Sequence, residues 1–303
     1  MGKKLKPCFF AMISALLLFS FSCSKVQKNR NDKITAVAGL PPVANLVSII
    51  AGNKIEVLSL LPAGRTPHDF SPKPSDIKSV SKAKIFFSSG MPFEKKSAAF
   101  LQKQMPVSDI SAGIKKLPLS DHTPDDQCGH QHHAHGDSYD PHIWLSPANL
   151  LIIAENICNA FEKIDPENAA YYRSNALLLK QKISEMDKYI RKALFPHAGK
   201  TFFIYHPSLG YFAKEYALKQ RAVELNGREV SAVQLADLIR EAKKEKASVI
   251  FVQQEFNPNT SRAIAKQING KVTSINPLQM DVLLFMRQIT DDLVDGFTKK
   301  IEE

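Results

Sequence analysis

Short apolar runs alternate with amphipathic segments along most of the chain. In the N-terminal half, four runs predict β-strands, and the residues between them place apolar side chains three and four positions apart, which predicts helices. The expected strands are residues 34–39, 55–61, 84–90 and 107–111. Regular alternation of strand and helix favours parallel βα units over an all-helical or all-strand fold.

The C-terminal half repeats this alternation. The expected strands are residues 201–206, 221–225, 247–254 and 271–276. The expected helices are residues 208–218, 231–246, 261–268 and 283–301. This half of the chain therefore predicts a second parallel lobe.

One segment between the two halves breaks the rhythm. From Ala169 to Leu194, apolar or aromatic residues recur every three or four positions without a glycine or proline. Asp165 and Pro166 before it predict an N-cap and a first helical residue. At 1.5 Å per residue the whole helix is about 43 Å long, far longer than a mean globular helix. We therefore expect a rod that joins two lobes.

These elements predict an α/β fold of two lobes, each a small, mainly parallel sheet flanked by helices, joined by one long rigid α-helix. The expected boundaries place an N-terminal lobe at 33–164, the connecting helix at 165–195 and a C-terminal lobe at 196–303. A polar, histidine-rich loop at 121–139 lies inside the N-terminal lobe.

The residues before the first strand have the pattern of an export signal followed by a tether. Three lysines among the first seven residues precede an uncharged apolar run at 9–21. This run is shorter than the roughly 20 residues of a membrane-spanning helix. We predict a signal peptide at 1–22, a tether at 23–32 and lipidation of Cys23, as in bacterial lipoproteins. Cleavage to a free exported protein, or retention of the apolar run as a helix, are the alternatives.

Charge and cysteine content narrow the function classes. The formal net charge is +10, or about +7 without the three signal lysines. Lysine and arginine are dispersed and form no stripe with interleaved aromatic residues, which argues against nucleic-acid binding. Beyond Cys8 in the signal peptide and Cys23 at the lipidation position, only Cys128 and Cys158 remain, so a structural disulfide framework is not expected in this exported chain.

Three of the nine histidines stand on stiff loops near predicted strand ends. His206 ends the strand 201–206, His68 follows the strand 55–61, and His142 lies between a proline and an apolar run. Open α/β sheets bind ligands at the carboxyl ends of their strands, and neutral imidazole is a common zinc ligand. A shared metal site is one interpretation. Three unrelated core or surface histidines are the other.

The histidine-rich loop carries a second kind of histidine. It is too polar to pack, and tracts of this composition bind metal loosely. Its candidate ligands are His122, Cys128, His130, His132, His133 and His135. A solvated linker is the alternative interpretation. His197, at the end of the long helix, is expected to face solvent and receives no role.

Four motifs, taken in order, give the chain a family resemblance over nearly its whole mature length. They are PHDFSPKPSDI (67–77), DPHIWLSP (140–147), YHPSLGYFAKEYAL (205–218) and NPLQMD (276–281). The chain resembles the zinc- and manganese-binding proteins of bacterial metal-importing ABC transporters, in the zinc-handling branch with a histidine-rich loop. The resemblance implies a metal in a cleft between two α/β lobes, with His68, His142 and His206 as its ligands. It also implies Zn²⁺ as the transported ion, because manganese-type relatives place a carboxylate where His206 stands and Mn²⁺ prefers oxygen donors.

Two positions depart from the family pattern. Relatives often carry Asp where this chain has Asn276, so the fourth ligand position falls on a neutral amide. That amide binds through its oxygen, holds a water or stands aside, and we expect weaker zinc binding than in an Asn276→Asp variant. Gln253 stands where relatives often have Glu, and Glu255 nearby is a candidate for a hydrogen bond to an imidazole N–H.

The resemblance implies a monomeric binding protein that captures Zn²⁺ outside the cytoplasm and delivers it to the membrane permease of an ABC transporter. A manganese- or iron-binding protein of the same family is the nearest alternative. Three histidines and a water are also the ligand set of many zinc hydrolases, but no HExxH-like helix is found in the sequence. A binding protein for cobalamin or an iron chelate, and an adhesion protein, are further alternatives.

Overall fold

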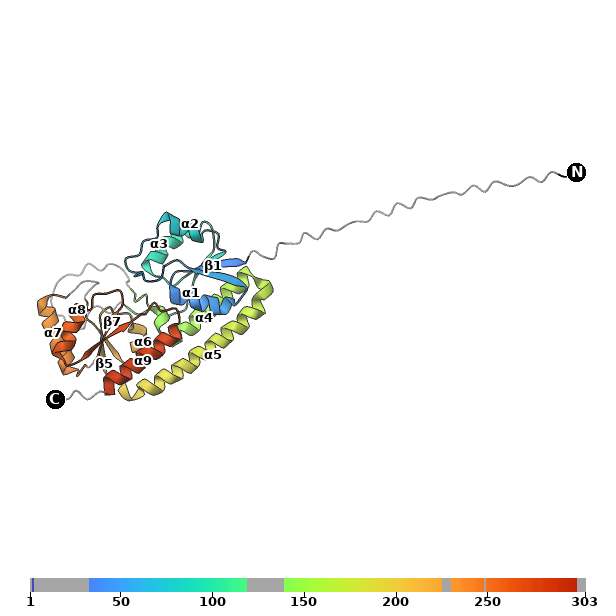
Figure 1. Ribbon diagram of the computed structural model, residues 1–303. Helices are drawn as coiled ribbons and strands as arrows, with labels where there is room; N and C mark the ends of the chain where they lie inside the picture. The colour runs from blue at the N-terminus through green and yellow to red at the C-terminus, as the bar shows by residue number, and fades with distance from the viewer. Residues whose placement is uncertain (1, 3–32, 119–138, 225–229, 248, 299–303) are drawn as a thin grey trace. The chain divides into compact units, whose positions relative to one another are not determined.

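Two parallel sheets and the helices around them make up the protein. The computed structural model describes residues 2, 33–118, 139–224, 230–247 and 249–298. From Lys33 onward the chain forms one compact unit that contains both sheets (Figure 1). Apart from residue 2, the predicted signal peptide and tether lie outside the described residues, as does nearly all of the histidine-rich loop.

The first lobe contains a four-stranded parallel sheet in the order β2-β1-β3-β4. Its strands are β1 (Ile34–Ala38), β2 (Ile55–Ser59), β3 (Ile85–Ser88) and β4 (Val107–Asp109). Every residue of β3 is buried, as expected for an inner strand of a sheet covered on both faces. The helices of this lobe are α1 (Pro41–Ala51), α2 (Pro74–Val80), α3 (Pro92–Leu101) and α4 (Pro147–Ile164). A short 3₁₀ turn, η1 (Ile143–Leu145), precedes α4.

The second lobe repeats this plan with the strand order β6-β5-β7-β8, again all parallel. Its strands are β5 (Thr201–Ile204), β6 (Lys219–Ala222), β7 (Val249–Gln253) and β8 (Lys271–Ile275). Its helices are α6 (Gly210–Glu215), α7 (Ala232–Lys244), α8 (Asn259–Gln267) and α9 (Val282–Thr298). Strand β6 starts two residues before the predicted strand 221–225 and ends at Ala222, so the strand was predicted too far along the chain.

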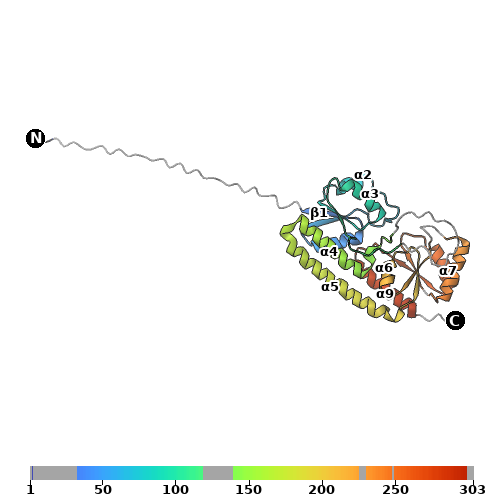
Figure 2. The same cartoon turned by 180° about the vertical axis from the view of Figure 1, so that it is seen from behind.

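The long helix α5 (Ala169–Leu194) joins the two lobes. It packs against α1 and α4 of the first lobe and against α9 of the second, and Figures 1 and 2 show it running beside all three. Its buried side chains recur at steps of three, four or seven residues along one face: Tyr172, Ala176, Leu179, Ile183, Ile190 and Leu194. The two-lobe α/β fold with a connecting helix is confirmed.

Both predictions about the ends of the long helix were wrong in detail. Asp165 does not cap α5, because residues Pro166–Asn168 form a separate 3₁₀ turn. Its carboxylate accepts hydrogen bonds from Asn168 Nδ2 at 2.8 Å and from the Tyr172 hydroxyl at 2.5 Å. At the other end His197 is buried rather than solvent-facing, with its ring 5.3 Å from that of Phe297. Packing of α9 over this corner is not visible in the local sequence.

The apolar core runs from one lobe into the other. One cluster of buried residues covers the first sheet, α4, α5 and α9, together with side chains of β5 and β7. A second, smaller cluster lies beneath α7 and α8 on the other face of the second sheet. Because the lobes share the first cluster through α5, they are parts of one folded unit. The predicted domain boundaries therefore stay a prediction.

A buried carboxylate fixes the loop after β3. Glu94 is fully buried, and its Oε2 accepts hydrogen bonds from the backbone N–H groups of Ser89, Gly90 and Met91 at 2.8–2.9 Å. Desolvation by burial raises the pKa of Glu94 to about 7, although these hydrogen bonds oppose the shift. The other oxygen, Oε1, lies only 1.7 Å from the position of a Cβ atom at Gly39.

Replacing Gly39 by alanine is therefore expected to destabilise the fold. The new methyl group would collide with a carboxylate that cannot turn away without breaking its hydrogen bonds, at a cost of about 1–3 kcal/mol. Urea unfolding of Gly39→Ala measures this loss. In a Glu94→Ala background the same substitution should cost much less, and strictly additive losses in the double variant would contradict the steric explanation.

Candidate metal site

Three loops present the histidines singled out in the sequence. His68 lies on the loop after β2, His142 directly precedes η1, and His206 follows β5. Phe70 anchors the first of these loops by packing edge-on against Phe93, with ring centroids 5.3 Å apart. The loops come from both lobes, so only the folded chain brings the three rings together.

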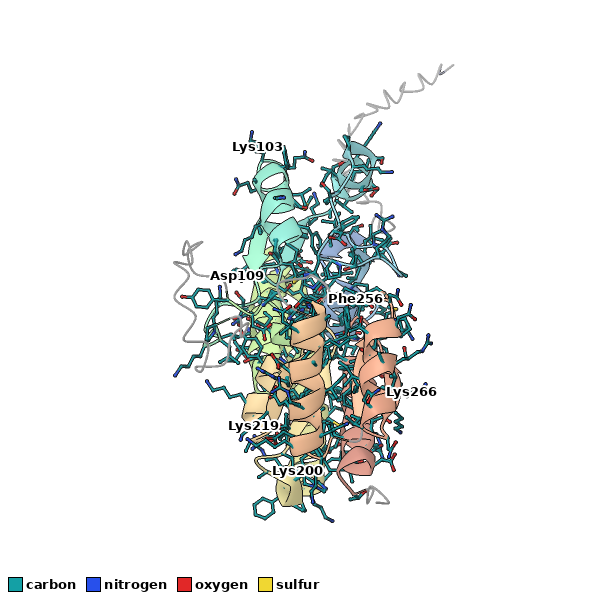
Figure 3. All side chains as sticks on the ribbon, turned by 90° about the vertical axis from the view of Figure 1, so that its left-hand side faces the viewer. Lys103, Asp109, Lys200, Lys219, Phe256 and Lys266 are labelled. Carbon is teal, nitrogen blue, oxygen red and sulfur yellow. The ribbon has the colours of Figure 1, made fainter. Side chains whose placement is uncertain are left out.

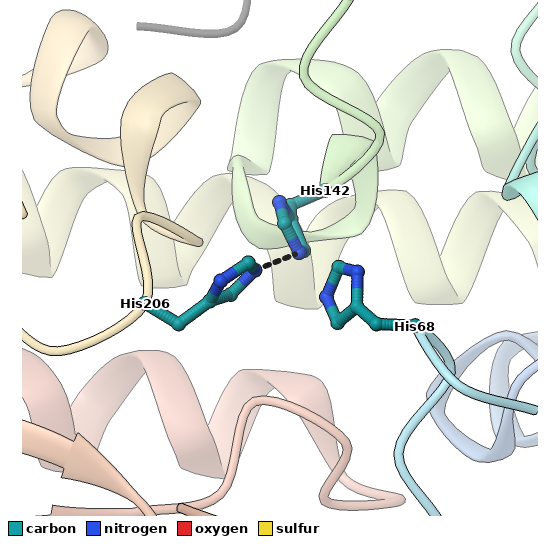
Figure 4. Close-up of side chains that lie close together, drawn as sticks. All are labelled: His68, His142 and His206. Carbon is teal, nitrogen blue, oxygen red and sulfur yellow. Dashed lines mark hydrogen bonds between the residues drawn. The ribbon is translucent and has the colours of Figure 1, made fainter. Parts of the chain in front are cut away.

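The structure places the three imidazoles in one cluster (Figure 4). One ring nitrogen of each residue lies within 4.8 Å of the corresponding atoms of the other two. The Nε2 atoms of His142 and His206 are 3.4 Å apart. Two nitrogens bound to one tetrahedral Zn²⁺ at about 2.0–2.1 Å stand about 3.3 Å apart. This pair therefore already has the spacing of one edge of a zinc tetrahedron.

Buried carboxylates orient two of the three rings. His142 Nδ1 lies 2.7 Å from Asp140 Oδ1, and His206 Nδ1 lies 2.6 Å from Glu224 Oε1. Both carboxylates are nearly inaccessible to solvent. A carboxylate only accepts, so each Nδ1 carries the proton and each Nε2 keeps its lone pair. Two Nε2 lone pairs then face each other across 3.4 Å, which is favourable only when a cation or a proton lies between them.

Neither carboxylate was found by sequence reasoning, and only Asp140 had a local signal in the sequence. Asp140 stands two residues before His142 in the DPHIWLSP motif. Its Oδ1 also accepts from the His142 backbone N–H at 2.9 Å, so the local turn itself brings carboxylate and ring together. Glu224 follows β6, the neighbour of β5 in the sheet, and only the strand order places it beside His206.

His68 is the ring without an orienting carboxylate among the described residues. It is exposed at the edge of the cluster, yet its pKa is lowered to about 3 by desolvation and by the imidazoles of His206 and His142. The ring is therefore neutral, and able to bind a metal, at neutral pH. The unfolded chain protonates this ring near pH 6.5 and the folded chain only near 3, so the metal-free fold gains stability as pH rises through that window.

Asn276 and Gln253, where the chain departs from the family pattern, make different hydrogen bonds. Asn276 Oδ1 accepts a hydrogen bond from the Leu278 backbone N–H at 3.0 Å. Gln253 is buried and clamps the His206 backbone: its Nε2 donates to the His206 carbonyl at 2.6 Å, and its Oε1 accepts from the His206 N–H at 3.2 Å. Glu255 makes no hydrogen bond to an imidazole in the described part of the chain, so that prediction gains no support.

A cleft of about 590 Å³ is lined by residues from both lobes. Residues of α1, β2 and the loop after β2, including Arg65, form one side. Glu255, Asn276 and Met280 belong to the other. The remaining candidate ligands, Cys23 and the histidines and cysteine of the loop, lie outside the described residues.

Comparison with known proteins agrees with this geometry. The family profile described as "Zinc-uptake complex component A periplasmic", ZnuA, matches residues 36–296. A crystal structure of ZnuA superposes with a TM-score of 0.80 at 27% identity, covering 88% of this chain and 99% of that one.

Two curated relatives show the same similarity. The zinc-binding protein AdcA of Streptococcus pyogenes serotype M3 is 28% identical over 305 residues, which cover 91% of this chain but only 56% of AdcA. The metal ABC transporter substrate-binding lipoprotein SloC of Streptococcus mutans serotype c is 27% identical, with 87% of this chain and 86% of SloC covered.

The chain belongs to the ZnuA family of zinc-uptake binding proteins. This membership confirms the resemblance seen in the four motifs and the expectation of a zinc-binding family. It also confirms that the chain is a substrate-binding component of a transporter and not an enzyme, which removes the zinc hydrolase from the alternatives.

Proposed function

We propose that this chain captures Zn²⁺ between its two lobes with His68, His142 and His206, and delivers it to the membrane permease of an ABC transporter. The facing Nε2 atoms of His142 and His206, 3.4 Å apart with their Nδ1 atoms bound to buried carboxylates, carry the proposal. Two nitrogen lone pairs stand at the spacing that a zinc ion requires. The third nitrogen donor is His68, on the loop after β2.

Zinc is preferred over manganese on the chemistry of the donors. Three imidazole nitrogens suit Zn²⁺, whereas Mn²⁺ prefers carboxylate and water oxygens. AdcA, named as a zinc-binding protein, supports the same choice. Manganese or iron transport stays the second candidate.

The proposed place of action is outside the cytoplasm. The family description includes the word periplasmic, and SloC is named as a lipoprotein of a metal ABC transporter. Among the described residues, no helix combines the length and apolar character needed to cross a bilayer. We propose that the chain acts as a monomer held at the membrane through lipidated Cys23, and that the histidine-rich loop collects zinc for the cleft.

Metal competition tests this function. A variant lacking residues 122–135 removes the loop histidines, and is incubated with equal concentrations of Zn²⁺ and Mn²⁺ before metal analysis. We expect one zinc per chain, little manganese, and weaker zinc binding as pH falls, because protons compete with zinc for the ring nitrogens. The full chain should bind additional zinc weakly. A preference for manganese at neutral pH would overturn the zinc assignment.

A further inference from the structure

The carboxyl edge of the second sheet presents one polar group from each of its four strands. His206 follows β5, Glu224 follows β6, Glu255 follows β7 and Asn276 follows β8. In a parallel sheet these ends lie along one edge, where ligands bind. The first two groups act together as a ring and its carboxylate partner. Glu255 and Asn276 line the cleft between the lobes, which the three histidines themselves do not line. They are the two groups of this sheet edge that are left for the fourth position on the cation.

The Asn276 amide is poorly suited to that position. Its oxygen already accepts the Leu278 backbone N–H, which fixes the side chain in a tight turn. An amide oxygen is also neutral, so it adds no charge to a site whose three nitrogen donors are neutral. The carboxylates of Asp140 and Glu224 are each committed to an imidazole Nδ1.

Glu255 is the uncommitted carboxylate of this cleft. Within the described residues its side chain has no ion pair, and the hydrogen bond that lowers its pKa comes from its own backbone. Partial desolvation raises the pKa of Glu255, and His206 and His142 would oppose that shift when protonated. Its carboxylate therefore has no fixed partner, although it lies within electrostatic reach of both rings.

The backbone beside Glu255 is fixed against the site. The ring of Phe256, labelled in Figure 3, stacks on the His206 imidazole with centroids 5.6 Å apart and an interplanar angle of 28°. Glu255 itself is exposed to the cleft, so its carboxylate can rotate while its backbone stays in place. Among the described residues, the three histidines form the set of candidate ligands whose atoms all lie within 4.8 Å of one another, and the Glu255 carboxylate does not belong to that set in this conformation.

We propose that Glu255 turns onto the captured cation and supplies its fourth, anionic ligand in place of the Asn276 amide. The assignment rests on the proposed function, because it needs a cation held by the three histidines. A carboxylate oxygen binds Zn²⁺ at about 2.0–2.2 Å and completes a tetrahedral set of three nitrogens and one oxygen. The negative charge that relatives often carry after the last strand is then provided by the neighbouring strand.

Zinc affinity of a Glu255→Gln variant tests the proposal. Loss of the carboxylate is expected to weaken zinc binding by at least about 10–100-fold in a chelator competition assay. That is the loss found when a group that only orients a metal ligand is removed. Glu185→Gln, which removes an exposed carboxylate on α5, is the matched control and should bind as the parent does. Adding Asn276→Asp to Glu255→Gln should restore much of the lost affinity, since it returns a carboxylate to the same sheet edge.

A spectroscopic measurement separates a ligand from a distant charge. The visible bands of the Co²⁺-loaded protein should change in Glu255→Gln and stay unchanged in Glu185→Gln. Unchanged bands, or a zinc affinity equal to that of the control, would overturn the assignment of Glu255. Either result leaves the proposed function intact as long as the parent chain binds zinc, whereas a parent chain without zinc affinity would defeat the proposed function itself.

Discussion

Replacing His142 by alanine is expected to lower zinc affinity by more than about 100-fold, beyond the range seen for residues that only orient ligands. The substitution removes one of the two nitrogens that stand at zinc spacing and leaves His68 and His206 as the remaining imidazole donors. It also leaves Asp140, which is buried, without the ring that it holds. Chelator competition at neutral pH measures the loss.

His197→Asn is the matched control for this variant. His197 is a histidine of the second lobe outside the cluster, packed against Phe297, so its replacement should leave zinc affinity unchanged. Thermal unfolding of the metal-free variants shows how much of the His142→Ala effect is structural. The buried Asp140 carboxylate loses the ring but keeps its hydrogen bond from the backbone N–H of residue 142, so the structural cost is expected to be about 1–3 kcal/mol. Zinc should no longer raise the melting temperature of that variant. Zinc stabilisation equal to the parent's would exclude His142 as a ligand.

The fold was largely predictable because buried parallel strands can be recognised from short stretches of sequence. Strands such as β3 and β7 are buried along their whole length, so they appear as unbroken apolar runs between helical segments. The long helix was predictable for the same reason, since its buried face repeats at a helical period. Its first turn was not, because Asp165 accepts a hydrogen bond from the Tyr172 hydroxyl, seven residues further along the chain, instead of capping the helix.

Boundaries between the lobes were harder to predict than the lobes themselves. Apolar periodicity shows that a side chain is buried, but not which sheet it packs against. Here α5 and α9 contribute to a core that also covers the first sheet. The burial of His197 follows from the same packing, because its cover is Phe297, a hundred residues further along the chain.

The candidate site was half predictable from the sequence. The proline-rich or constrained loops of His68, His142 and His206 identified three candidate ligands, and the family resemblance implied that they bind one metal ion. The partners of these rings depend on strand order, which the sequence does not state: Glu224 meets His206 only because β6 lies beside β5. The contribution proposed for Glu255 likewise depends on β7 lying between β5 and β8.

The two buried carboxylates give the second large expected effect. Asp140→Asn and Glu224→Gln keep a hydrogen-bonding group of similar shape beside each imidazole but remove its negative charge. Each variant is expected to bind zinc about 10–100-fold more weakly, because the ring loses basicity and its fixed tautomer. The losses should be larger for alanine at either position, since the ring is then free to turn.

These two substitutions act on different rings, which makes their combination informative. Asp140 holds His142 and Glu224 holds His206, so the fold-losses of Asp140→Asn and Glu224→Gln should multiply in the double variant if each ring binds the cation independently. A double variant no weaker than either single one would mean that the loss of one oriented ring already releases the cation from the other. Unchanged affinity in both single variants would instead show that the two carboxylates stabilise the fold without tuning the metal site.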